Sequence, residues 1–410
     1  MVELDNRDQN QLRGGTPPWS LTLTSPPRSF VKESFCCDIL VVGAGITGAL
    51  CGEYFAMRGY RTRIIDHQRP GHGSTTASTA MLLWEIDQRL GHLADLYGFE
   101  RASKIYQTSF RATAGLVDLV ESRGLPCGLR RRHSVYLSTP DVEARQLNVE
   151  HRIRRRAGLP GEFLGRRSLS EWFGINRDAA IVSPNSAESN PILLVKGILA
   201  EAIGQQAQIL DAEAIGYHDA SRSVTVELDD GHVIEAKYVV LATGYVMPDM
   251  IQSDIHKIVS TWAVATPPQL PTSLWRGRAL IWEASEQYSY VRTTRENRII
   301  IGGEDEESIV DPNARDQLIP SKANILLDKL KALWPDITAF AEFKWSGAFG
   351  TTADGLPLIG RVPGHPRIFA AYGYGGNGIT YSYLASRVIG ALIEGKNKEW
   401  FDYFAIDRSL

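Results

Sequence analysis

The sequence contains few cysteines. Only four occur among its 410 residues: Cys36, Cys37, Cys51 and Cys127. Their number and spacing fit neither a disulfide framework nor a zinc site. We therefore expect no bound metal and a reducing, cytoplasmic setting, in which thiols stay free.

The sequence also lacks a long uninterrupted apolar run and an excess of charge of one sign. Its most apolar stretch, Ile39–Met57, contains glycines and Glu53 and does not predict a membrane-spanning helix. The first residues have neither the basic nor the apolar region of a signal peptide. The formal net charge of −3 gives no reason to expect a nucleic-acid partner. The length allows two globular domains.

Residues 1–34 are polar and rich in Gly and Pro. This composition predicts an arm that lies over the surface, with a disordered start. Trp19 is expected to anchor the arm. The alternative is a leader without fixed contacts.

A βαβ unit is predicted directly after the arm. Cys37–Val42 has the apolar, β-branched pattern of a buried parallel strand, Thr47–Arg58 has helical periodicity, and Arg61–Ile65 predicts a second strand. Later elements are predicted as a helix beginning at Asn190-Pro191, strands at Gln208–Leu210, Val224–Leu228 and Tyr238–Leu241, and a last helix at Ile379–Glu394.

Two longer regions are assigned by their general pattern. Residues 86–180 are predicted to be mainly helical, and residues 255–303 mainly β. Basic runs at 130–133 and 152–156 are expected to be solvated surface, with an anionic partner as the alternative.

The first strand leads into a glycine motif, Gly43-Ala44-Gly45-Ile46-Thr47-Gly48. The first glycine permits a tight turn, the second lets the backbone approach a pyrophosphate, and the third lets the helix pack closely on the strand. The helix N-terminus then offers free N–H groups to phosphates. Asp66, at the end of the second strand, has the spacing expected for a carboxylate that binds ribose. A dinucleotide is therefore predicted, without a choice between NAD and FAD.

Three further features favour FAD. Gly73-Ser74-Thr75, followed by Ser78-Thr79, forms a turn rich in hydroxyl and N–H donors. The strand at Val239–Leu241 ends in the small residues Ala242-Thr243-Gly244. A glycine turn, Gly373–Gly378, precedes the last helix, whose N-terminus would stabilise the negative charge of a reduced flavin. The alternative for this third feature is a turn without a ligand.

Together, these motifs resemble the FAD-dependent glycine oxidase / D-amino-acid oxidase / sarcosine oxidase superfamily. Within it, they are most similar to the amine oxidases of the gamma-glutamylputrescine oxidoreductase type. The resemblance extends from about residue 19 to about residue 395. It includes the segments DILVVGAGITGAL, GSTTASTAMLLWEID, NPILLVKGI, VVLATGY, YSYVRTTRENRIIIGGED, WSGAFGTTADGLPLIG and YGYGGNGITYS.

The resemblance implies an α/β fold with two domains. A discontinuous Rossmann-type FAD-binding domain would comprise residues 35–85, 180–245 and 341–400, after the arm at 1–34. An α+β substrate domain with a mixed or antiparallel sheet would comprise residues 86–179 and 246–340. The positions that it places against FAD are Gly43, Ala44, Gly45, Ile46, Thr47, Gly48, Asp66, His67, Gly73, Ser74, Thr75, Ser78, Thr79, Ala242, Thr243, Gly244, Gly375, Gly376, Asn377, Gly378, Ile379 and Thr380.

Several positions depart from the patterns of the family. Relatives that oxidise amino acids carry an arginine that binds the substrate carboxylate, and its position here is Phe349. Sarcosine oxidase relatives carry a lysine where this chain has Thr380, and an oxygen-activating lysine within the run at residues 299–301. The positions used for covalent flavin attachment are near Gly347 and Ala77, so non-covalent FAD is expected. His72, which is close to the second of these, is taken as structural.

Candidate substrate residues follow from these departures. Arg292 is the remaining candidate to bind an anion, the alternative being a surface or salt-bridged arginine. Glu85 is the candidate to attract a cationic amine, the alternative being a capping or surface acid. An aromatic pocket wall, or simply core, is expected from Trp84, Tyr288, Tyr290, Trp345 and Phe349.

The resemblance implies oxidation of the C–N bond of a primary or secondary amine, or of an amino acid derivative, by hydride transfer to flavin N5. Oxygen or another acceptor would take the electrons. The alternative is a flavoprotein subunit or a biosynthetic FAD enzyme of another redox class. An FAD monooxygenase is less favoured, because those relatives carry Gly-Asp-Ala where this chain has GYGGNG.

Overall fold

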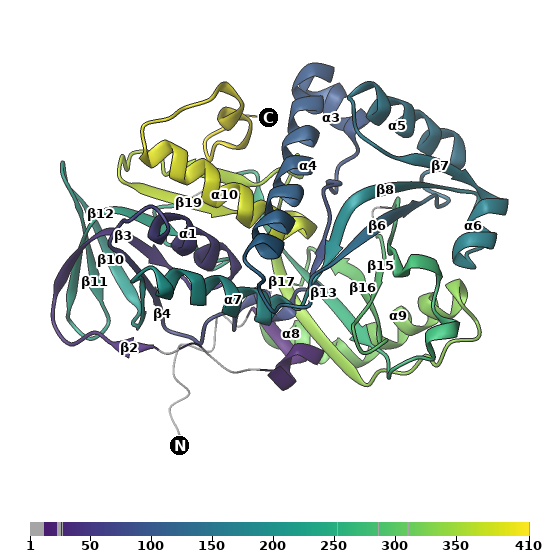
Figure 1. Ribbon diagram of the computed structural model, residues 1–410, viewed down its shortest axis with the longest axis horizontal. Coiled ribbons are helices and arrows are strands. Elements are labelled where there is room, and N and C mark those ends of the chain that lie inside the picture. Colours follow the sequence, from purple (N-terminus) through teal and green to yellow (C-terminus); the bar gives the residue numbers. More distant parts are fainter. Residues whose placement is uncertain are drawn as a thin grey trace.

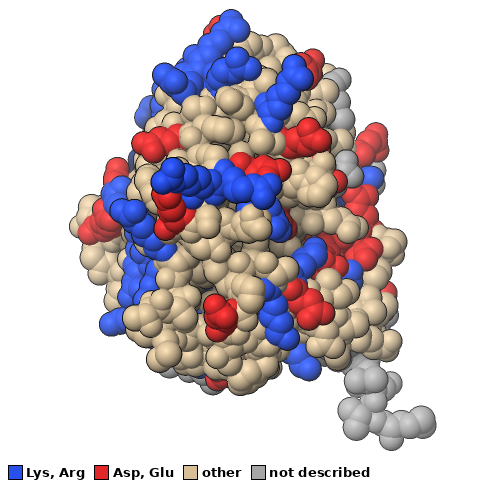
Figure 2. Space-filling model, turned by 90° about the vertical axis from the view of Figure 1, so that its right-hand side faces the viewer, with Lys and Arg blue, Asp and Glu red and all other residues tan. Residues whose placement is uncertain are grey.

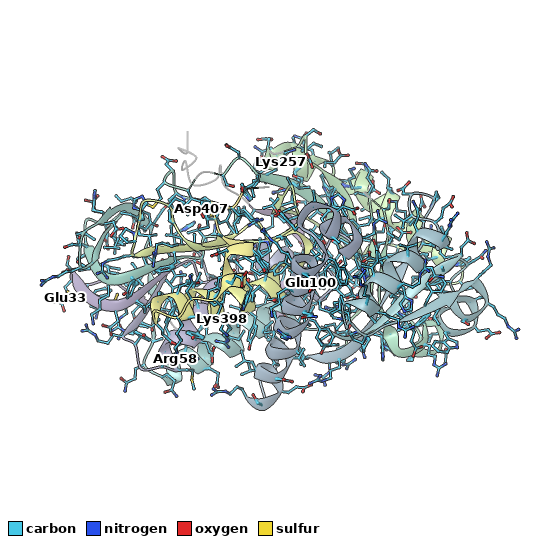
Figure 3. The ribbon with its side chains drawn as sticks, turned by 90° about the horizontal axis from the view of Figure 1, so that it is seen from above. Glu33, Arg58, Glu100, Lys257, Lys398 and Asp407 are labelled. Atoms are coloured by element: carbon cyan, nitrogen blue, oxygen red, sulfur yellow. The ribbon has the colours of Figure 1, made fainter. Side chains whose placement is uncertain are left out.

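The strands of the molecule form two sheets, on either side of a long central helix (Figure 1). The computed structural model describes residues 12–22, 26, 28–251, 253–285, 287–309 and 311–409. The central helix is α4 (Phe99–Ser122). Seen from above, Glu100 near its start lies between the two halves of the molecule (Figure 3).

One sheet, here called the Rossmann sheet, has a parallel centre in the order β9-β4-β3-β12-β19. An antiparallel hairpin, β10–β11, extends it beyond β12, and β18 pairs with β19. Its strands are β2 (Ser29–Phe30), β3 (Phe35–Val42), β4 (Thr62–Asp66), β9 (Gln208–Asp211), β10 (Ala214–Asp219), β11 (Val224–Leu228), β12 (Val233–Leu241), β18 (Leu358–Arg361) and β19 (Ile368–Tyr372).

Three helices pack together beside the Rossmann sheet. Helix α1 (Ile46–Ala56) joins β3 to β4, and contacts both α7 (Pro191–Gly204) and α10 (Gly378–Ile393). Every residue of α1 is buried, because the helix lies between the sheet and these two neighbours. The predicted βαβ unit is confirmed, with boundaries within two residues of those expected.

The other sheet, here called the mixed sheet, has the order β1-β17-β13-β16-β15-β14-β6-β8-β5, with β7 also paired to β8. Neighbouring strands in this sheet are antiparallel, except that β14 and β6 are parallel to each other. Its strands are β1 (Arg13–Thr16), β5 (Met81–Leu82), β6 (Arg130–Leu137), β7 (Glu162–Gly165), β8 (Ala179–Glu188), β13 (His256–Ala265), β14 (Leu280–Glu283), β15 (Tyr290–Thr293), β16 (Ile299–Glu306) and β17 (Phe343–Thr352). The predicted fold class is thus confirmed.

The remaining helical segments are short or lie around the mixed sheet. They are η2 (Pro18–Thr22), α2 (Ser74–Ala77), α3 (Leu90–Tyr97), α5 (Ala144–Arg156), α6 (Arg166–Phe173), η3 (Pro271–Ser273), η4 (Arg276–Arg278), α8 (Pro312–Gln317), α9 (Ile319–Leu333), η5 (Gly375–Asn377) and η6 (Glu399–Phe404). None of the helices in these described ranges is long and apolar enough to cross a membrane.

The prediction of mainly helical structure for residues 86–180 is wrong in part. The region also contains β6 and β7, and β6 lies inside the mixed sheet. The basic run at 130–133 concealed this strand, because its first half carries polar side chains and only Ser134–Leu137 are all buried.

The second basic run, residues 152–156, belongs to α5. The prediction that it is solvated surface is not correct for all of its residues. Arg154 is buried, and its Nε lies 2.8 Å from Glu150 Oε1. Elsewhere, arginines on exposed faces pair with acids, as Arg131 does with Glu121 at 2.7 Å. On the face that includes α6, Lys and Arg are interspersed with Asp and Glu (Figure 2).

The N-terminal arm is part of the mixed sheet and does not simply lie over the surface. Strand β1 pairs antiparallel with β17, Arg13 opposite Gly347. Trp19 is buried and donates a hydrogen bond of 3.0 Å to the Ser78 carbonyl, so the predicted anchor is confirmed. The expected disordered start, residues 1–11, lies outside the described residues.

Three further strands fall on the other side of the expected domain boundaries. Strands β5, β8 and β17 pair within the mixed sheet, although their residues were assigned to the FAD-binding domain. Hydrogen bonding between distant segments sets this membership, and sequence motifs do not show it.

Candidate active site

A cavity of about 850 Å³ lies between the two sheets. One wall comes from residues at the carboxyl ends of β3, β4 and β12 and from the turn before α10. The opposite wall comes from β15, β16 and β17 of the mixed sheet. Ligands of open α/β sheets bind at the carboxyl ends of the strands, so this is the expected place for a dinucleotide.

The glycine motif at the end of β3 requires its glycines for steric reasons. Gly43 has φ +103°, and a Cβ on it would lie 2.4 Å from the carbonyl oxygen of Ala242. A Cβ on Gly48 would lie 1.8 Å from the Gly43 carbonyl oxygen. The first glycine therefore lets β3 and β12 meet closely at the cavity, and Gly48 lets α1 pack on the turn.

Asp66 fixes the turn from the end of β4. Its two carboxylate oxygens accept hydrogen bonds of 2.7 Å from the backbone amides of Ala44 and Gln68. Burial raises the pKa of Asp66, and these two hydrogen bonds oppose that effect. Each carboxylate oxygen has further acceptor capacity for a ribose hydroxyl.

Two further segments approach each other at the cavity. A Cβ on Gly244, which has φ +69°, would lie 3.7 Å from the hydroxyl of Ser74 in α2. The hydroxyl of Thr75 accepts a hydrogen bond of 3.1 Å from the Ile46 amide, and so links α2 to the start of α1. The turns at 73–79 and 242–244, separate in sequence, thus meet beside the glycine motif.

The glycine turn before α10 is held by the segment that follows β5. The amide of Gly376 donates a hydrogen bond of 2.8 Å to Asp87 Oδ2, and Asn377 Nδ2 donates one of 2.6 Å to the Glu85 carbonyl. Helix α10 begins at Gly378, and that residue lines the cavity. The N-terminus of a sixteen-residue helix therefore lies at the cavity wall, where it favours negative charge.

The wall formed by the mixed sheet is aromatic and acidic. Its side chains include Tyr288, Tyr290, Phe349 and Trp282, together with the carboxylates of Asp305, Asp87 and Glu85. No lysine or arginine lines the cavity within the described part of the chain.

Glu85 belongs to a buried network behind this wall. Its Oε1 accepts a hydrogen bond from the Ser134 hydroxyl and lies 3.9 Å from Arg154 Nη1. Burial raises the pKa of Glu85, while Arg154 and hydrogen bonds from Ser134 and Ser183 oppose the shift. Its Oε2 is buried, with no hydrogen-bond partner among the described residues. Glu85 thus lines the cavity as an acceptor that is only partly satisfied.

A model of the FAD dependent oxidoreductase family, DAO, matches residues 38–392. The chain belongs to this family. Gamma-glutamylputrescine oxidoreductase of Escherichia coli (strain K12) is 24% identical to it over 388 residues, which cover 92% of this chain and 88% of that protein. Glycine oxidase of Geobacillus kaustophilus (strain HTA426) is 25% identical over 387 residues, which cover 88% of this chain and 93% of that protein.

A solved structure has the same fold. The crystal structure of glycine oxidase from Geobacillus kaustophilus has a TM-score of 0.77 to this chain at 22% identity, and the match covers 92% of this chain and 99% of that chain. The family membership confirms the prediction of an FAD-dependent oxidoreductase.

Most of the positions predicted to contact FAD line the cavity, but three do not. Ala44 faces Asp66 with its amide, and Gly48 packs α1 on the turn. The Thr380 hydroxyl donates a hydrogen bond of 2.9 Å to the Leu83 carbonyl, so it is turned into the protein interior. These three positions therefore lie outside the cavity lining.

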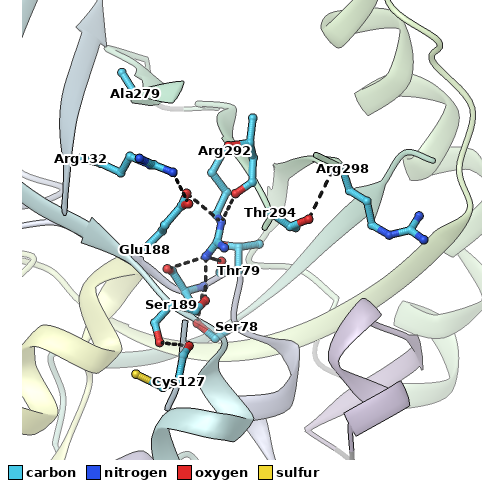
Figure 4. A network of polar contacts seen from close by, with 12 residues as sticks. Ser78, Thr79, Cys127, Arg132, Glu188, Ser189, Ala279, Arg292, Thr294 and Arg298 are labelled. Carbon is cyan, nitrogen blue, oxygen red and sulfur yellow. Dashed lines mark hydrogen bonds and ion pairs between the residues drawn. The ribbon is translucent and has the colours of Figure 1, made fainter. Parts of the chain in front are cut away.

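Arg292 does not line the cavity, which corrects its expected role as an anion binder. Its Nη1 donates hydrogen bonds to the carbonyls of Thr79, Ala80 and Ser189 at 2.8–3.0 Å, and its Nε lies 3.7 Å from Glu188 Oε2 (Figure 4). A guanidinium engaged in this way joins the turn at 79–80 to the end of β8. The salt-bridged alternative is the correct one.

Two of the predicted aromatic residues also lie elsewhere. Trp345 is buried, and its indole donates a hydrogen bond of 2.8 Å to the Ala77 carbonyl. Trp84 donates one of 2.7 Å to the Pro184 carbonyl. Neither residue lines the cavity, whereas Tyr288, Tyr290 and Phe349 do.

Asp87 and Asp305 also line the cavity and were not predicted from the sequence. Asp87 lies two residues after Glu85, a spacing that can place both acids on one side of an extended segment. Asp305 lies near the end of β16, in the run Gly302-Gly303-Glu304-Asp305. No local signal marks Asp305, because the fold alone brings it to the cavity.

Proposed function

We propose that the protein oxidises the C–N bond of an amine that carries no carboxylate beside the reacting carbon, with FAD as the cofactor. The observation that carries this proposal is the charge of the cavity, where acids line the wall and the described residues contribute no lysine or arginine. A substrate carboxylate would find no lysine or arginine among the described residues of the wall, whereas an ammonium group would be attracted by the acids.

The residues present fit FAD. Gly45, the second glycine of the motif, lines the cavity directly before α1, where the absence of a side chain lets a pyrophosphate approach the backbone. We infer that the turn at Gly45–Thr47 and the start of α1 hold the phosphates, that Asp66 binds ribose, and that the segments at 73–79 and 375–379 surround the flavin ring. His67, which also lines the cavity, belongs to the same proposed set.

The bound ammonium must first lose its proton to water, because a hydride leaves only from the neutral amine. FAD held at this site would supply the two-electron acceptor for a hydride from the carbon beside the nitrogen, and water would hydrolyse the resulting iminium ion. The side chains of the mixed sheet orient the amine. The Glu85 carboxylate attracts the ammonium form of the substrate, and the rings of Tyr290 and Phe349 exclude water from the reacting carbon. The N-terminus of α10 stabilises negative charge at the cavity wall.

Non-covalent binding of FAD, a cytoplasmic location and oxygen as acceptor belong to the same proposal. Gly347 and Ala77 carry no side chain able to attach to flavin, and the His72 ring contacts Arg13 at 2.8 Å. All four cysteines are free thiols. We also propose a division into an FAD-binding part around the Rossmann sheet and a substrate-binding part around the mixed sheet.

The first experiment is an absorption spectrum of the purified protein, before and after acid precipitation. We expect a flavin spectrum, and flavin in the supernatant after precipitation. Anaerobic addition of a simple amine, such as n-butylamine, should then bleach the flavin band. A flavoprotein that no amine reduces would instead support the alternative of a subunit or of another redox class.

A further inference from the structure

Two carboxylates on separate segments, those of Asp87 and Asp305, line the cavity. Asp87 follows β5, and Asp305 lies near the end of β16. A Cβ built on Gly376 would lie 3.0 Å from Asp87 Oδ1 and 3.2 Å from the Tyr288 hydroxyl, so these two groups converge on one place.

The negative charge of Asp87 acts on Asp305 and disfavours a second negative charge there. Burial raises the pKa of Asp305 to about 7, and the charges of Asp87 and Glu304 act in the same direction. Burial also raises the pKa of Asp87. Two neighbouring carboxylates of this kind are unfavourable as a charged pair unless a cation is close to both.

The described residues do not supply that cation. Lys322 on α9 acts on Asp305, but its Nζ lies 2.8 Å from Glu306 Oε1 and 3.6 Å from Glu304 Oε2. Asp305 Oδ1 is buried and has no hydrogen-bond partner in the described ranges. A buried acceptor that lines a cavity and lacks a donor indicates a ligand that brings one.

Two aromatic rings lie beside the acids. Tyr288 and Tyr290 both line the cavity, and their ring centroids are 5.9 Å apart. Aromatic faces attract alkylammonium groups, and the attraction is stronger when the cation is desolvated. Carboxylates and aromatic rings together form a site for an organic cation. Rings that packed only against each other would not require acidic side chains beside them.

We propose that Asp87 and Asp305 bind a second ammonium group of the substrate, which is therefore a diamine or a longer oligoamine. The proposal rests on the proposed amine oxidation, because it assigns to the same cavity a reacting nitrogen near Glu85 and a remote nitrogen near Asp305. It identifies two specificity-determining residues, and it excludes amino acids as preferred substrates.

The test is equilibrium binding to the FAD-loaded protein. Anaerobic titrations with 1,4-diaminobutane and with n-butylamine would be monitored by the change in the flavin spectrum on binding. If the amine reduces the flavin, the shift in Tm would be measured instead. We expect 1,4-diaminobutane to bind at least about tenfold more tightly, the effect of one hydrogen-bonded charge. In Asp305→Asn and in Asp87→Asn, this ratio should fall to about one.

The matched control is Asp328→Asn, the same acid-to-amide change at an exposed position of α9. Its ratio should equal that of the unaltered protein. A preference for the diamine that survives both cavity substitutions would overturn the assignment of the second site.

The pH dependence gives a second test that needs no variant. Asp305 is more ionised above its pKa of about 7, so the preference for the diamine should increase from pH 6 to pH 8. The groups around Asp305 are Thr261 on β13, Tyr288 and Tyr290 at β15, Asp87, Glu304 and Lys322. A preference that stays constant over this range would contradict the role of Asp305.

The two proposals can fail separately. If n-butylamine bleaches the flavin but binds as tightly as the diamine, amine oxidation stands and the second site is wrong. If the diamine binds at least about tenfold more tightly and no amine bleaches the flavin, the second site stands and the proposed reaction is wrong.

Discussion

The two walls of the cavity are built in different ways. On the Rossmann side, the wall is largely backbone: glycines that leave space, amides at the start of α1, and the turn before α10. On the side of the mixed sheet, it consists of carboxylates and aromatic rings from segments far apart in the chain. Backbone recognition suits a cofactor common to a whole family, whereas side-chain recognition can change with the substrate.

The largest expected effect concerns the boundary between these walls. Arg292→Met should lower the free energy of unfolding by about 3–5 kcal/mol, because the carbonyls of Thr79, Ala80 and Ser189 lose their donor. Glu188 loses its contact with Arg292 but keeps its ion pair with Arg132 at 2.8 Å. Urea unfolding followed by circular dichroism measures this change.

A matched control for this change lies three residues further on. Arg295 is exposed, and Arg295→Met should change the free energy of unfolding by less than about 0.5 kcal/mol. If Arg292→Met instead kept its stability and lost only amine binding, Arg292 would have the anion- or substrate-binding role that the structure denies it.

The next effect would damage the Rossmann wall alone. Gly43→Ala should destabilise the protein by at least about 2 kcal/mol and leave it largely free of FAD, because φ +103° and the Ala242 carbonyl oppose a Cβ. The ratio of flavin to protein absorbance measures occupancy. Gly204→Ala, at a helical glycine with open space around its Cβ position, should retain full occupancy.

A smaller change should affect the affinity for FAD more than the fold. Asp66→Ala removes a charged acceptor for ribose, which should weaken FAD binding by about 1.5–3 kcal/mol. Loss of the hydrogen bonds from Ala44 and Gln68 should also loosen the turn. Dialysis followed by titration with FAD measures the Kd, and an unchanged Kd would remove Asp66 from the proposed ribose site.

The smallest expected effect would reverse the charge preference of the mixed-sheet wall. Phe349→Arg introduces a cation where relatives that oxidise amino acids carry one, so binding of n-butylamine should weaken by roughly 1.4 kcal/mol, or about tenfold. Binding of glycine should strengthen. Phe349→Leu is the control, because it removes the aromatic ring without adding a charge. Equal effects of both substitutions would show that shape, and not charge, selects the substrate.

The same contrast explains what the sequence allowed us to predict. The βαβ unit and the glycine motif depend on neighbouring residues, so periodicity and spacing were enough to place Gly43, Gly48 and Asp66. The role of Arg292 depends on carbonyls from residues 79, 80 and 189, which only the fold assembles. Strand β6 was missed because its polar first half hides its pattern.

The pairing of β1 with β17 has a consequence for the order of folding. Arg13 lies opposite Gly347, and Leu12 on one side and Ala348 on the other both line the cavity. During translation, β1 is synthesised early and β17 late, because more than 300 residues separate them in the sequence. The mixed sheet, and with it the cavity, therefore cannot be completed until most of the polypeptide has emerged, and early-made strands must wait with an open edge.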